Sequence, residues 1–157
     1  MKFLLVGLAQ LSALLSFAAA AQTESVPIKG DCTFDPPLDW QASQVRWVGP
    51  CARGRAQGHG VLRHIVNGKV ESVFYGRLEN GVTKVGVVDL VGSYKAGDFE
   101  NGQLIERDAD FEARFRALEV AAKAATAAAA RYEKEGNKES AKYYRNQATN
   151  WLNSIRE

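Results

Sequence analysis

The sequence contains one short frame three times: GPCARG at residues 49–54, GRLENG at 76–81 and GDFENG at 97–102. Each copy reads glycine, any residue, an apolar residue, two further residues of any kind, then glycine. The second and third copies begin about 20 residues apart, a period that is typical of a repeating β unit. The frame therefore predicts a repeated β structure over this part of the chain.

Asparagine–glycine pairs mark the turns of that structure, at 67–68, 80–81 and 101–102. Both central residues of a type I′ hairpin turn need a positive φ, and this pair tolerates it best. Valine-rich and aromatic stretches alternate with the turns, at 61–66, 70–78 and 82–90. Consecutive hairpins of this kind predict an antiparallel β-meander over residues 44–107.

Residues 108–157 are rich in Ala, Lys, Arg and Glu and predict an antiparallel helical hairpin, so that the fold class is α+β. Gly136 is placed to end the first helix and Asn137 to cap the second. The first helix carries one apolar stripe, formed by Phe111, Phe115, Leu118, Ala122, Ala125, Ala129 and Tyr132. The second carries Ala141, Tyr144, Ala148, Trp151 or Leu152, and Ile155. We expect Phe111 and Phe115 to cover one face or end of the sheet.

Residues 1–21 are predicted to be a secretory signal peptide. Lys2 supplies the positive charge, residues 3–15 form an apolar run, and small residues provide an Ala-x-Ala cleavage site at 18–20 or 19–21. The run is too short for a membrane anchor. We therefore expect a periplasmic or secreted protein with no transmembrane segment in the mature chain.

The sequence has two cysteines, Cys32 and Cys51. In an oxidising compartment an even number of cysteines indicates a disulfide, and a bridge closing a loop of about 20 residues is worth about 3 kcal/mol. A redox or metal role is not expected, because there is no Cys-x-x-Cys and no third ligand. The bridge would hold the proline-containing segment 22–43 as a cap over an open edge of the sheet.

The net charge of +2 is small, but the charges are unevenly distributed. No acidic residue lies between Asp39 and Glu71, whereas acidic residues dominate from 71 to 110. This asymmetry predicts two electrostatically different surfaces, unless the charges simply solvate the polar faces of strands. The residues that we expect to bind a partner are Arg46, Trp47, Arg53, Arg55, Arg63 and His64.

Residues 47–62 extend the first copy to W-x-G-x-C-x-x-G-x-x-x-G-x-G-x-L. This pattern resembles the MORN (membrane occupation and recognition nexus) repeat, with Cys51 where the family has a bulky aromatic residue. The second copy keeps the front half, from Phe74, and the third has Lys95 in place of the aromatic residue. Over residues 45–106 the resemblance implies stacked β-hairpins that form an elongated, twisted sheet and serve as a binding or scaffolding surface.

The helical region is similar, over residues 129–141, to one tetratricopeptide-type helical hairpin. Arg145 departs from that pattern, which places an aromatic residue there. A single unit cannot form the superhelical groove of that family, so the similarity implies helix packing alone.

The sequence favours no catalytic, metal or cofactor site. A phosphate loop at residues 54–60 would need a helix after it, and a strand is predicted there. His59 and His64 have no nearby carboxylate or cysteine to complete a metal site. No serine or cysteine has an evident general base beside it. We expect no enzyme activity, no cofactor and, for an exported chain of near-neutral charge, no nucleic acid.

The function that follows is a non-enzymatic exported protein-binding or scaffolding module built on a MORN-like sheet. Its partner is expected to be a protein with an acidic surface. One alternative is an immunity protein that neutralises a secreted antibacterial effector. Another is a peripheral binder of anionic lipid or cell-wall polymer, drawn by its basic residues.

Overall fold

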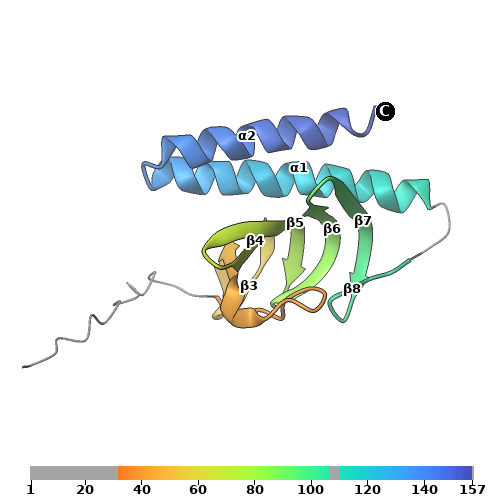
Figure 1. Cartoon of the computed structure of the whole chain (residues 1–157), viewed down its shortest axis with the longest axis horizontal. Coiled ribbons are helices and arrows are strands. Elements are labelled where there is room, and N and C mark those ends of the chain that lie inside the picture. The colour runs from red at the N-terminus through yellow and green to blue at the C-terminus, as the bar shows by residue number, and fades with distance from the viewer. Residues whose placement is uncertain (1–31, 107–109, 157) are drawn as a thin grey trace, which may run out of the picture.

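The computed structural model describes residues 32–106 and 110–156, which form a sheet covered on both faces (Figure 1). A six-stranded antiparallel sheet has the order β1-β4-β5-β6-β7-β8, and β2 and β3 form a separate hairpin. Its strands are β1 Val45–Val48, β4 Gly58–Val66, β5 Lys69–Glu79, β6 Val82–Leu90, β7 Ser93–Glu100 and β8 Gln103–Leu104. The remaining elements are the 3₁₀ helix η1 Ala42–Gln44, β2 Cys51–Ala52, β3 Arg55–Ala56, α1 Phe111–Lys134 and α2 Lys138–Asn153. The predicted α+β class, helical hairpin and Cys32–Cys51 disulfide are confirmed, whereas the predicted signal peptide lies outside the described residues.

The asparagine–glycine turns have the predicted conformation. Asn67, Asn80 and Asn101 have φ values of 50°, 48° and 50°, and the glycine after each is also positive. The same pair of positive φ values occurs at Arg53 and Gly54, between β2 and β3. That small hairpin was not predicted, because arginine is not a typical residue for the first position of such a turn.

Four glycines face one another across the centre of the sheet. Gly60 pairs with Gly76, Gly76 with Gly86 and Gly86 with Gly97, one from each of β4 to β7. They lie on the face that carries Leu62, Phe74 and Val88. This row leaves a shallow path without side chains across four strands.

Two aromatic rings fill that path. A Cβ at Gly60 would lie 2.5 Å from the Trp47 ring, and a Cβ at Gly76 would lie 2.2 Å from the Phe74 ring. The first two copies of the repeated frame therefore each place their aromatic ring against their own glycines. The third copy has Lys95 at that position, and Leu104 approaches Gly97 instead.

The opposite face of the sheet packs against the helices. α1 crosses β4 to β7, and its buried alanines allow close approach to Val61, Tyr75 and Val87. α2 packs beside α1, and its Tyr144 and Trp151 reach the Tyr75 ring at centroid distances of 6.2 and 5.5 Å. This layer contains the larger of the two cores.

The segment from Cys32 to Trp40 pairs through Thr33 with β3 and also covers the glycine face and the hairpin turns of the sheet. Thr33 pairs with Arg55, the Asp35 amide donates to Gly81 and the Leu38 amide donates to Gly102. Its apolar side chains pack on the core around Phe74 and Leu62. Without the segment this apolar face would be exposed to water.

The helix ends follow the sequence signals. The side chains of Asp110 and Asn137 cap α1 and α2, and Gly136, with φ of 78°, follows the end of α1. Phe111 and Phe115 are 63% and 40% exposed, so the expectation that they cover the sheet is wrong. They lie in the first turns of α1, and α2 is too short to pack against those turns.

The second helix settles one alternative that the sequence left open. Trp151 is 6% exposed and belongs to the core, whereas Leu152 is 48% exposed. The indole ring fills the space beside Tyr75 and Tyr94, at a centroid distance of 5.5 Å from each. The larger side chain therefore occupies the buried position.

The glycine row generates a paired test. Gly76→Ala should lower the free energy of unfolding by about 3 kcal/mol, because the new methyl group would also lie 2.6 Å from the Val85 carbonyl oxygen, which cannot move. Gly97→Ala meets only Leu104 Cδ1 at 3.2 Å, so its effect should stay below about 1 kcal/mol. Urea denaturation measures both, and equal effects would contradict the packing role.

Candidate functional site

The predicted arginines do not form one patch. Arg46 and Arg63 are directly opposite each other on β1 and β4, on the face that carries the helices. Arg53 is exposed in the β2–β3 turn, and Arg55 follows it on β3. The structure therefore brings together one pair, Arg46 and Arg63, and places the other pair on the separate small hairpin.

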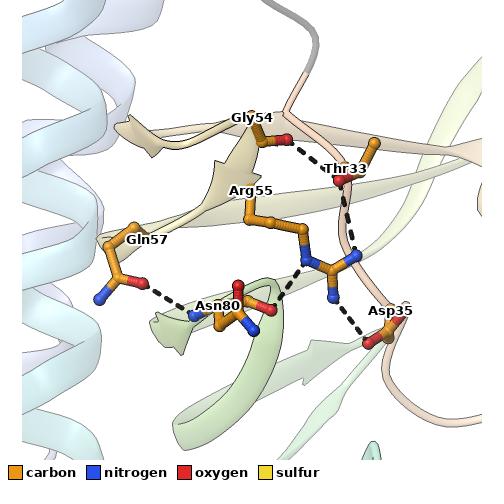
Figure 2. Close-up of polar contacts among 6 residues, drawn as sticks. All are labelled: Thr33, Asp35, Gly54, Arg55, Gln57 and Asn80. Atoms are coloured by element: carbon orange, nitrogen blue, oxygen red, sulfur yellow. Dashed lines mark hydrogen bonds and ion pairs between the residues drawn. The ribbon is translucent and has the colours of Figure 1, made fainter.

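Arg55 makes hydrogen bonds to two distant segments of the chain (Figure 2). Its guanidinium donates to the Asn80 carbonyl oxygen at 2.9 Å and to the Asp35 carboxylate at 3.0 Å. The Thr33 hydroxyl, which donates to the Gly54 carbonyl at 3.0 Å, lies 3.5 Å from the same guanidinium. Arg55 thus joins the N-terminal segment to the β5–β6 turn, and its charge is neutralised within the chain.

Trp47 and His64 lie on the face opposite to Arg46 and Arg63. The Trp47 indole donates to the Pro50 carbonyl at 3.0 Å while its ring covers glycines. His64 stacks on Trp40 at a centroid distance of 4.8 Å and lies 3.3 Å from the Ser72 hydroxyl. Both side chains therefore pack on the glycine face of the sheet, beside the core around Phe74 and Leu62, and neither shares a surface with Arg63.

A pocket of about 340 Å³ lies where β4 and β5 meet the turn of the helical hairpin. Its lining comes from four elements and consists of Arg63, Val70, Val73, Tyr132, Glu139, Ser140, Tyr143 and Tyr144. A volume of several hundred Å³ lined by apolar and aromatic side chains, with a few polar groups, is typical of ligand sites. We take this arginine–tyrosine pocket as the candidate site.

Arg63 is the cation of this pocket. It is half-buried, and NH1 donates to the Tyr132 hydroxyl at 3.3 Å. Within residues 32–106 and 110–156 no carboxylate lies within ion-pair distance of its guanidinium. Arginine has five donors, so most of the hydrogen-bonding capacity of Arg63 is available to a ligand.

Tyrosines form the apolar wall. Tyr132 and Tyr144 stack at a centroid distance of 5.5 Å, and Tyr143 meets Tyr144 edge to face at 5.1 Å. Burial raises the pKa of the Tyr144 hydroxyl, so this group stays protonated at neutral pH. The wall therefore supplies neutral rings and hydroxyl groups around a single guanidinium.

A buried polar group lies beside this wall. The Tyr75 hydroxyl is fully buried, and Tyr143 is its polar neighbour. Burial, followed by the neighbouring Tyr143, raises its pKa.

The described residues contain no cluster of three or more metal-ligating side chains. His59 and His64 lie on opposite faces of β4, so they cannot share a ligand. Neither described helix is sufficiently apolar over its length to cross a bilayer.

The sequence identified Arg63 but missed the rest of the pocket. Tyr132 and Tyr144 are predicted as apolar stripe residues, and Ser140 and Tyr143 carry no motif. Spacing along a helix indicates which residues share a face, but not which strand end that face meets. No signal in the sequence places residue 63 beside residue 132.

Comparison of the chain with protein-family models, with curated proteins and with solved structures found no match.

The structural role of Arg55 can be separated from that of Arg53. Arg55→Met should lower the free energy of unfolding by about 1–2 kcal/mol, because it leaves the Asn80 carbonyl and Asp35 without this donor. Arg53→Met should change it by less than about 0.5 kcal/mol, since Arg53 is exposed in a turn. Chemical denaturation of both variants gives the comparison, and a neutral Arg55→Met would show that the contacts contribute no stability.

Asp89, on β6 beside pocket-lining Val73, should make stability depend on pH. Burial raises the pKa of its carboxyl above 3.8 in the folded state, so the folded protein binds this proton more tightly than the unfolded chain. The resulting destabilisation is absent below the unfolded-state pKa and grows as pH rises through the folded-state pKa. Asp89→Asn should therefore raise the melting temperature at neutral pH and leave it unchanged in acid.

Asp98→Asn is the matched control on the neighbouring strand. The Asp98 carboxylate lies 2.7 Å from Arg116 NH2, so its loss should not raise the melting temperature. A rise in both variants would indicate a general charge effect and would contradict the assignment to burial of Asp89.

Proposed function

We propose that this chain is a non-enzymatic exported protein that binds an acidic surface of a partner protein through the arginine–tyrosine pocket. The observation that supports it best is the Arg63 guanidinium, which is half-buried among tyrosines without a carboxylate partner in the described structure. Binding a carboxylate there would satisfy donors that the fold leaves unused. Arg46, exposed on the adjacent strand, would add attraction and speed of association.

The MORN resemblance belongs to the same proposal. It is supported by the contacts of Trp47 and Phe74 with the glycines of their own copies, which give the aromatic and glycine positions of the frame a shared packing role. In this proposal the repeats are the rigid scaffold, and the helical hairpin completes the binding surface. The Cys32–Cys51 disulfide suits an exported protein.

A comparison of three immobilised baits tests the proposal. The baits are the mature chain, the Arg46→Glu/Arg63→Glu variant and, as a control for charge elsewhere, Arg53→Glu. An envelope extract of the native source is passed over each. We expect one acidic protein to be retained by the first and third baits, to be at least tenfold depleted on the second, and to elute as salt rises.

The proposal fails if all three baits retain the same proteins equally, because then Arg46 and Arg63 carry no contact. It also fails if the wild-type bait retains only anionic lipid or wall polymer. Melting temperatures of the baits show whether each variant is folded. Arg63→Gln replaces the double variant if charge reversal prevents folding.

A further inference from the structure

We propose that the arginine–tyrosine pocket binds a carboxylate attached to an apolar or aromatic body. This inference rests on the proposed function, because it names the group that the acidic partner presents. The same chemistry has two sources, the C-terminal residue of a polypeptide and a free small organic acid. The experiment below separates them.

The polar end of the pocket matches a carboxylate. Arg63 donates one hydrogen bond, to the Tyr132 hydroxyl, which leaves the proton of that hydroxyl free to be donated onward. The guanidinium and the hydroxyl are 3.3 Å apart, so they offer two neighbouring donors to the two oxygens of one carboxylate. The Ser140 hydroxyl lines the same pocket and donates to no group in the described structure.

The rest of the pocket requires an apolar body on the ligand. Val70 and Val73 lie on one side and the rings of Tyr132 and Tyr144 on the other. Val70 is 44% exposed, so a ligand ring or branched side chain there would remove apolar surface from water. At about 340 Å³ the pocket can hold a group the size of one bulky residue.

The charge balance selects a monoanion. Glu139, exposed at the rim, places a negative charge beside the one positive charge of Arg63. A phosphate or a polyanion would meet this carboxylate without gaining a second lining cation. The pocket should therefore prefer an apolar monocarboxylate to inorganic phosphate or an acidic polymer.

Binding of N-acetyl-L-phenylalanine to the purified chain tests this inference, with N-acetyl-L-phenylalaninamide as the neutral control. Titration is followed by tyrosine and tryptophan fluorescence and by NMR. The acid should bind at least tenfold more tightly than the amide, and inorganic phosphate should bind more weakly than the acid. Equal binding of acid and amide, or no binding of either, would overturn the inference.

Four variants locate the site. Arg63→Gln should weaken the acid at least tenfold and leave the amide unchanged, whereas Arg53→Gln should change neither. Tyr132→Phe keeps the stacked ring and removes one donor, so it should weaken the acid about threefold. Glu139→Gln removes the repulsion and should strengthen the acid about twofold. Unchanged acid binding in both Arg63→Gln and Tyr132→Phe would contradict the assignment.

Peptides identify the source of the carboxylate. A soluble octapeptide that ends in phenylalanine with a free carboxyl group should bind as tightly as the free acid if the ligand is a chain terminus, and its C-terminal amide should not bind. Binding of the free acid alone indicates a small organic acid. Loss of partner retention by the Arg46→Glu/Arg63→Glu bait without any carboxylate binding would overturn this inference and leave the proposed function standing. If the chain binds the carboxylate but retains no protein in an Arg63-dependent way, the proposed function is overturned and this inference stands.

Discussion

The contact on which the structure depends is that of two aromatic rings with a row of glycines. Trp47 and Phe74 lie on strands where the neighbouring residues have no side chain, and a methyl group at Gly60 or Gly76 would enter the ring. The rings replace the side chains that the row lacks, and they seal one face of the sheet with few residues. The core on this face is consequently small, and the single segment from Cys32 to Trp40 covers it.

That covering segment is hydrogen-bonded to three of the hairpin turns. The carbonyl groups of Gly54, Gly81 and Gly102 accept hydrogen bonds from Thr33, Asp35 and Leu38, one residue of the segment at each turn. A turn of another shape would direct its carbonyl away from the segment. The Cys32–Cys51 bridge fixes the start of the segment beside β2, and Arg55 links its middle to the β5–β6 turn. The predicted disulfide and one predicted binding residue thus serve the same attachment.

Local signals in the sequence predicted the elements well, because their causes are local. Asn80 and Gly81 specify a turn by their own backbone preferences, and Asn137 caps α2 through its own side chain.

The assembly of these elements depends on contacts between distant residues. Phe111 belongs to an apolar stripe but is exposed because α2 is shorter than α1. Nearness in sequence groups the predicted binding residues, whereas alternation along β1 and β4 and the separate β2–β3 hairpin divide them in space. Of that group, Arg63 lines the arginine–tyrosine pocket, and its neighbour Tyr132 comes from a helix almost 70 positions later in the chain.

The position of Arg63 is unfavourable for folding alone. It points toward the helices from a strand whose next residue in the same direction, Val61, is fully buried. Withdrawing a guanidinium from water without a counter-charge costs free energy, and a single hydrogen bond to a tyrosine hydroxyl offsets only part of it. Arg55, which is also half-buried, has the Asp35 carboxylate as its partner. The difference between the two arginines is the physical argument for the proposal that the charge of Arg63 serves a ligand, with the tyrosines around it shaping what that ligand can be.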